Sequence, residues 1–165
     1  MAAGDLLADF CPQCNEPPST GAATPDVRNG HPVLDFDRSV AEAAVFTGFM
    51  PWYYDGGGVT AYAVASFTSD TNNAHTAQLE VSLERIGDGQ QDLDADGFAA
   101  AKDLTLTVPS TCGNTDVGSV SFSDGAEMDN LAAGEMFRVK VRCDTLGSDF
   151  IGDLELLRLV LRETL

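Results

Sequence analysis

From residue 31 onward the chain repeats one pattern, in which short segments of alternating apolar and polar residues are separated by clusters of turn residues. Alternation with a period of two places the apolar side chains of a strand on one face and the polar ones on the other. Eight segments follow this pattern: 31–37, 43–50, 59–68, 76–86, 104–109, 117–123, 137–145 and 153–163. Short strands with Gly, Asn and Asp between them predict an all-β sandwich domain over residues 31–165.

Eight antiparallel strands can form a jelly roll, a sandwich in which strand seven lies between strands two and four and strand eight lies between strands one and three. This order predicts that basic residues face acidic ones on neighbouring strands. In one sheet the facing residues are Arg138, Lys140 and Arg142 against Glu80 and Glu84. In the other sheet they are Arg158 and Arg162 against Asp35 and Asp37.

Residues 1–30 lack any period of 2 or 3.6 and contain several prolines, so we predict an extended N-terminal arm ahead of the sandwich domain. An arm with little core of its own is expected to lie against another subunit. The arm residues predicted to contact that partner are Cys11, Pro12, Cys14, Pro17 and Pro18.

The charge balance narrows the choice of partners, because 26 acidic and 9 basic residues give a formal net charge of −17. A surface of this sign repels phosphate backbones, so we expect no nucleic-acid partner. No apolar run approaches the roughly 20 residues that span a bilayer, so we expect no membrane partner. The first ten residues lack the basic start of an export signal, and the 4 cysteines are therefore predicted to be free thiols or metal ligands.

The segment 92–103 resembles a 12-residue calcium loop. Oxygen ligands stand at positions 1, 3, 5 and 12, and Gly97 stands at position 6, where such loops turn sharply. The candidate ligands are Asp92, Asp94, Asp96 and Asp103. The final Asp is shorter than the usual Glu, and the preceding segment is a predicted strand. The alternative is an acidic loop without metal, in which Phe98 covers the edge of the core.

The spacing of Cys11 and Cys14 is that of half a zinc site. A closed site needs two further ligands, which Cys112 and Cys143 or the arm of a second subunit can supply. Cys143 falls on the inward phase of its strand, as a small buried apolar residue does. The alternatives are a redox pair and two thiols without a function.

Three aromatic residues, Trp52, Tyr53 and Tyr54, precede the glycine-rich stretch 56–58. Aromatic rings beside a flexible loop suit the binding of sugar rings, and they equally suit contact with another subunit. No hydrolase, metalloprotease or phosphate-loop motif occurs. Of the two histidines, His31 precedes Pro32 at the start of a predicted strand and His75 falls in a predicted turn, so both are expected to be surface residues. We therefore expect a protein that is not an enzyme.

Four stretches resemble a group of small tailed-bacteriophage proteins: NGHPVLDFD (29–37), AVFTG (44–48), ERIGDGQQDLDADGF (84–98) and LAAGEMFRVKVR (131–142). The resemblance covers about residues 29–163 and does not include the arm. It implies a component of the virion, made in the host cytoplasm.

Two interpretations follow from the resemblance. The first is a capsid decoration or cement protein, a homotrimer on the outer surface of the capsid that contacts the major capsid protein and copies of itself. The second is a receptor-binding or carbohydrate-binding component of a fibre or tail, with a surface glycan as partner.

Overall fold

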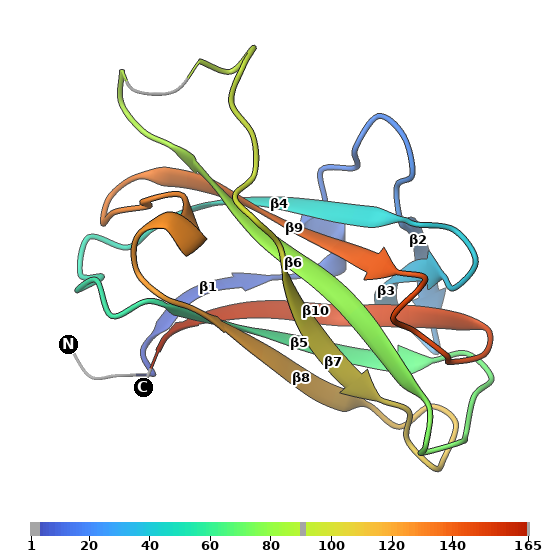
Figure 1. Ribbon diagram of the computed structural model, residues 1–165. Coiled ribbons are helices and arrows are strands. Elements are labelled where there is room, and N and C mark those ends of the chain that lie inside the picture. Colours follow the sequence, from blue (N-terminus) through green and yellow to red (C-terminus); the bar gives the residue numbers. More distant parts are fainter. Residues whose placement is uncertain (1–3, 90–91, 165) are drawn as a thin grey trace.

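The computed structural model describes residues 4–89 and 92–164, and it confirms an all-β sandwich of two antiparallel sheets (Figure 1). The first sheet has the order β2 (Thr24–Arg28), β3 (His31–Asp37), β10 (Asp153–Glu163), β5 (Val59–Phe67), β8 (Asp116–Phe122), and β1 (Leu6–Phe10) also pairs with β10. The second sheet has the order β4 (Ala43–Phe49), β9 (Met136–Asp144), β6 (Thr76–Ile86), β7 (Lys102–Thr107). Two short 3-10 helices, η1 (Pro12–Cys14) and η2 (Ala126–Met128), complete the described elements, and no described helix is long and apolar enough to cross a membrane.

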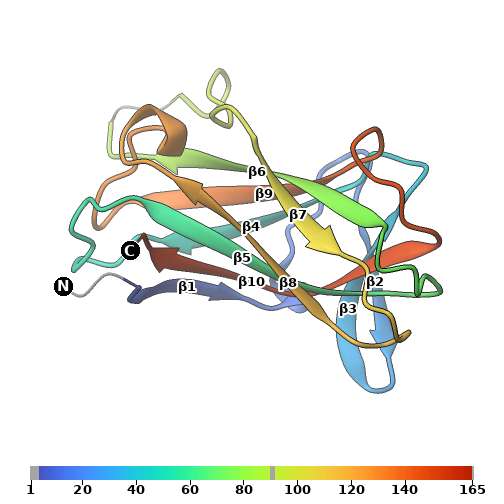
Figure 2. The same ribbon diagram turned by 60° about the horizontal axis from the view of Figure 1, so that its bottom comes forward.

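The strand order confirms the predicted jelly-roll connections, because β9 lies between β4 and β6, and β10 lies between β3 and β5 (Figures 1 and 2). The inward faces of the two sheets enclose one core. Its largest fully buried side chains include Phe36, Phe46, Phe67, Phe122, Phe137 and Phe150. Burial of each such ring contributes roughly 1.5–3 kcal/mol, so the alternation seen in the sequence also marks what holds the sheets together.

The predicted charge pairing between β6 and β9 is confirmed. Glu84 lies opposite Arg138 and accepts a hydrogen bond of 2.9 Å from its guanidinium, and Glu80 is paired with Arg142. Lys140 lies opposite Ser82 and places its Nζ 4.4 Å from the centre of the Phe98 ring. Phe98 therefore packs on the charged outer face of this sheet instead of covering the edge of the core.

The predicted pairing in the other sheet is wrong. Only residues 153–156 of β10 pair with β3, and this register places Asp35 opposite Glu155. Arg158 and Arg162 lie farther along β10, beside β1. Arg158 lies 3.5 Å from Asp9, and Arg162 donates a 3.1 Å hydrogen bond to the carbonyl oxygen of residue 4.

The segment predicted to be an extended arm lying against another subunit is extended, but it lies against its own sandwich. β1 pairs with β10, β2 pairs with β3, and Leu7 and Phe10 are buried in the core. Between these strands, the amide of Val45 donates to Asn15 Oδ1 (3.0 Å) and the amide of Glu16 donates to the Val45 carbonyl (2.7 Å). Residues 15–16 thus cover the edge strand β4, and the structure shows no separation between residues 4–30 and the sandwich.

Candidate functional site

The β4–β5 connection lies at the end of the sandwich where β1 begins and β10 ends (Figures 1 and 2). Exposed aromatic residues stand in this connection and at the end of β4. We call Phe49, Trp52 and Tyr53 the aromatic ledge. Their side chains are 63%, 82% and 57% exposed, respectively. Large apolar side chains grouped in solvent in this way mark binding surfaces. The sequence analysis did not predict Phe49 as a site residue. Its position on the outward-facing phase of its strand could have indicated that its ring is exposed.

The ledge is held in place by contacts to distant parts of the chain. The Trp52 ring lies directly on Gly134, where a Cβ atom would come within 2.1 Å of the ring. The Tyr53 hydroxyl donates a 2.9 Å hydrogen bond to the carbonyl oxygen of Leu6. Both rings are therefore oriented before any ligand arrives, which lowers the entropy cost of binding.

Tyr54 differs from its two neighbours because it is buried beneath the ledge. Its hydroxyl donates to Asp124 Oδ1 (3.2 Å) and accepts from the amide of Gly58 (3.0 Å). Burial raises the pKa of Tyr54 to about 12, so its hydroxyl keeps its proton at neutral pH. Tyr54 thus anchors the connection instead of offering a ring to a ligand.

A hollow of about 240 Å³ opens next to the ledge, and we call it the end hollow. It is lined by Tyr54, Gly56, Asp124, Gly125, Asn130, Leu131, Ala132 and Ala133. The carboxylate of Asp124 and the amide of Asn130 are its polar side chains besides the tyrosine hydroxyl. Asn130 has a left-handed backbone (φ 57°), and its backbone N–H donates to the carbonyl oxygen of Gly125 (2.9 Å). Such backbone geometry is held by the surrounding structure and is frequent at binding sites.

Two carboxyl groups, of Glu163 and Asp124, lie at the candidate site. Glu163 is buried under the β4–β5 connection, where its Oε1 accepts from the amides of Asp55 (3.2 Å) and Gly57 (3.3 Å). With Asp124 in the hollow, this arrangement favours neutral or cationic ligands over anionic ones. The lining of the end hollow includes Tyr54, which follows Tyr53, and Ala133, which precedes the Gly134 under the Trp52 ring. The ledge thus provides apolar rings, and the neighbouring hollow provides a carboxylate and an amide.

The predicted calcium loop has a compact turn at its start. The amides of Ala95 (2.9 Å) and Asp96 (2.8 Å) both donate to the carbonyl oxygen of Asp92, and the Asp94 amide donates to the Asp92 carboxylate (3.1 Å). Asp103 lies within β7, opposite Glu80. Over residues 4–89 and 92–164, no group of three or more His, Cys, Asp or Glu side chains is arranged to hold a metal ion. Calcium binding here stays a prediction.

The predicted zinc ligands do not come together within one chain. Cys11 and Cys14 are neighbours, with 2.7 Å between their Sγ atoms. Cys112 instead lies against Arg28 and the carbonyl oxygen of Thr68, and Cys143 is buried in the core. Burial raises the pKa of Cys143 to about 11. A zinc site shared between two chains stays a prediction.

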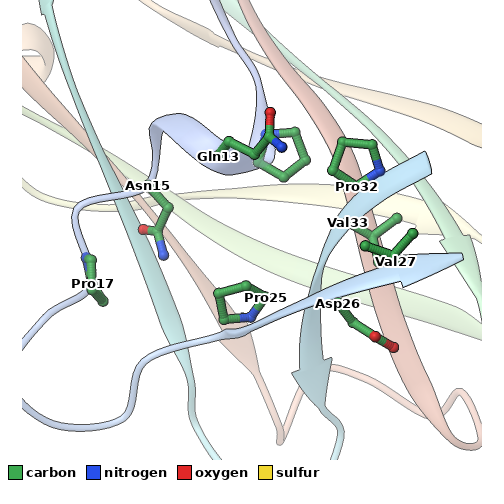
Figure 3. A pocket seen from close by; sticks show the side chains of 9 residues that line it. Gln13, Asn15, Pro17, Pro25, Asp26, Val27, Pro32 and Val33 are labelled. Carbon is green, nitrogen blue, oxygen red and sulfur yellow. The ribbon is translucent and has the colours of Figure 1, made fainter. Parts of the chain in front are cut away.

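A second hollow, of about 490 Å³, lies between η1 and the β2–β3 hairpin (Figure 3). It is lined by Pro12, Gln13, Asn15, Pro17, Pro25, Asp26, Val27, Pro32 and Val33. We call it the proline hollow. Two of the five residues predicted to contact a partner through the arm, Pro12 and Pro17, line it. Its described lining contains no aromatic ring, so it is a different kind of surface from the ledge.

No family model matches the sequence, and no curated protein matches it. The fold is similar to part of an exo-β-1,3-galactanase from Phanerochaete chrysosporium (TM-score 0.56, 9% identity, 97% of this chain and 29% of that one). It is also similar to part of an arabinose-bound α-L-arabinofuranosidase (TM-score 0.54, 11% identity, 97% and 26%). A carbohydrate-binding module that recognises mannan matches over its full length (TM-score 0.45, 12% identity, 99% and 100%). The chain spans less than a third of the two enzymes, and at these identities the likeness concerns the fold.

Proposed function

We propose that this protein is a carbohydrate-binding β-sandwich that binds a neutral glycan at the aromatic ledge and the end hollow. The observation that carries the proposal is the Trp52 ring, which is 82% exposed yet held against Gly134 beside a hollow with polar groups. An exposed apolar ring raises the free energy of the unbound protein. A ring fixed in that position is consistent with a binding role.

The chemistry of the surface suits a sugar. A sugar ring has apolar C–H faces and hydroxyl groups on its rim, so it needs a flat apolar platform and nearby polar groups. Trp52 and Tyr53 provide the platform, and Asp124 and Asn130 provide an acceptor and an amide. The net charge of −17 and the carboxylates near the site disfavour uronic acids and sulfated sugars.

The fold is compatible with this proposal. The galactanase structure of similar fold contains β-1,3-galactotriose, and the arabinofuranosidase structure contains arabinose. Fold likeness alone does not assign a function, so the argument depends on the ledge and the end hollow. Carbohydrate binding also agrees with the second interpretation of the phage resemblance, a receptor-binding component of a fibre or tail.

Capsid decoration, the first interpretation, depended on an arm that reaches another subunit. Residues 4–30 instead pair with their own sandwich, so the arm no longer supports that interpretation. Decoration stays a prediction of the resemblance alone, together with the trimer and the contact to the major capsid protein.

The test is a screen of the purified protein against neutral, amino and acidic polysaccharides, followed by titration calorimetry with the best oligosaccharide. We expect Trp52→Ala to weaken binding at least tenfold, or about 1.4 kcal/mol, because it removes the platform. Leu146→Ala is the matched control, since Leu146 is 96% exposed and lies in the β9–β10 connection. Binding that Trp52→Ala leaves unchanged would refute the proposed site, and the absence of binding to every neutral glycan would refute the function.

A further inference from the structure

Cys11 and Cys14 are positioned more closely than two independent thiols. Cys11 is the N-cap of η1 and Cys14 is its last residue, and in such a turn side chains three residues apart lie above one another. Their Sγ atoms are 2.7 Å apart, which is well inside the separation of non-bonded sulfur atoms, whereas a disulfide bond is about 2.05 Å long. Small rotations of the two side chains are enough to join them.

Both cysteines are open to solvent. Cys14 is exposed and Cys11 is partly exposed. Cys11 also lines an open hollow of about 430 Å³ together with His31, Leu157 and Arg158. A small disulfide reagent can therefore approach this pair, whereas the thiol of Cys143 is enclosed by the core.

The two thiols are not equivalent. Cys11 lines the open hollow together with Arg158, whereas Cys14 is not part of its lining. A reagent in that hollow therefore meets Cys11 first, and the thiolate is the form of a thiol that attacks disulfides. Cys14 lies next to it as the resolving thiol.

We propose that Cys11 and Cys14 are a redox site that forms a reversible intramolecular disulfide by exchange with a low-molecular-weight disulfide such as glutathione disulfide. The Cys11 thiolate attacks one glutathione sulfur, which forms a mixed disulfide and releases one glutathione thiolate. Cys14, once deprotonated, attacks the Cys11 sulfur, closes the protein disulfide and releases the second glutathione. The two protein thiols are oxidised, one glutathione disulfide is reduced to two glutathione molecules, and the thiol protons pass to these products or to the solvent.

The position of the disulfide gives it a structural effect. η1 connects β1, in the first sheet, to residues 15–16, which cover the edge of β4 in the second sheet. Pro12 and Gln13, between the two cysteines, also line the proline hollow (Figure 3). Closing a loop of four residues lowers the equilibrium population of the locally opened crossing by up to about twentyfold in the chain-entropy model.

The experiment compares thiol counts and intact masses after treatment with glutathione disulfide. The reduced chain has 4 thiols, and we expect oxidation to remove two of them with a mass loss of two hydrogen atoms. Cys14→Ser should instead accumulate one glutathione on Cys11, because the resolving thiol is absent. Cys112→Ser is the matched control at an exposed cysteine, and it should lose the same two thiols as the wild type.

Hydrogen exchange tests the structural effect, since the amides of Glu16 and Val45 should exchange several times more slowly in the oxidised protein. A wild-type chain that keeps all its thiols in excess glutathione disulfide would overturn the proposal. So would a bond that links two chains, or a stoichiometric zinc ion that joins two chains through these cysteines. Equal exchange rates in both redox states would overturn the structural effect.

Discussion

Asp35 is a carboxyl group in an unfavourable position. It lies on β3 opposite Glu155, and its Oδ1 is buried without a hydrogen-bond partner among the described residues. Burial, followed by the negative charges of Glu155, Asp26 and Asp153, raises the pKa of Asp35 from 3.8 to about 6. The charged form of Asp35 therefore destabilises the fold at neutral pH.

The folded-state and unfolded-state pKa values of Asp35 give the sign and the size of its contribution to the free energy of unfolding. A carboxyl group whose pKa is higher in the folded state contributes stability below about pH 4, and this contribution is lost as the pH rises to about 6 and beyond. A pKa of about 6 in place of 3.8 corresponds to about 3 kcal/mol at most above pH 7. Because the side chain is partly exposed, we expect Asp35→Asn to stabilise the protein by about 1–2 kcal/mol at pH 8 and by about zero at pH 4.

The assay is urea denaturation of both proteins between pH 4 and pH 8. It should be followed by far-ultraviolet circular dichroism, because the only tryptophan is exposed in the folded state and reports unfolding poorly. Asp94→Asn removes the same charge from an exposed loop and serves as the control. A stability difference between wild type and Asp35→Asn that does not change with pH, or a less stable variant at pH 8, would refute the reasoning.

Three further predictions concern packing, a buried charge and a buried thiol. In thermal melts, Gly118→Ala should lower stability by about 1–3 kcal/mol, since its Cβ would lie 2.4 Å from a backbone oxygen of β7. The control is Gly97→Ala, whose Cβ would lie in open space and which should leave stability unchanged. Arg28→Met should lower the free energy of unfolding in urea by about 2–4 kcal/mol, because it leaves the buried Glu155 without its cation. A decrease of less than about 1 kcal/mol would contradict this prediction. Cys143 should resist iodoacetamide at pH 8 until the protein unfolds, and labelling of the native protein, read by peptide mass, would show that it is not enclosed.

The alternating segments predicted the strands and their order well, because each strand from β3 to β10 has an inward apolar phase. The facing charges of Glu84 and Arg138 followed from that order. The prediction that residues 1–30 lie against another subunit was wrong because the strands in this segment lack a regular alternation of apolar and polar residues. A register shift in β1 between Leu6 and Ala8 buries Leu7 and Phe10, which are three positions apart, and most of β2 is exposed on both faces. A similar shift in β10 between Leu156 and Arg158 accompanies the wrong pairing of its arginines.

The candidate site was predicted only in part. Trp52 and Tyr53 stood out in the sequence because aromatic residues next to glycines suggest an exposed surface. Nothing local connected them to Asp124, Asn130 or Gly134, which lie about 70 to 80 positions later in the chain.

By itself, the sequence determined that this chain is a sandwich, because a period of two is a local property that each strand carries independently. Only the tertiary structure decided that residues 4–30 complete their own domain and that Trp52 rests on Gly134 beside the end hollow. These outcomes depend on contacts between residues far apart in the chain. Such contacts depend on how the two sheets pack and on which edge strands are protected by other segments. Neither produces a periodic pattern of residues in the sequence.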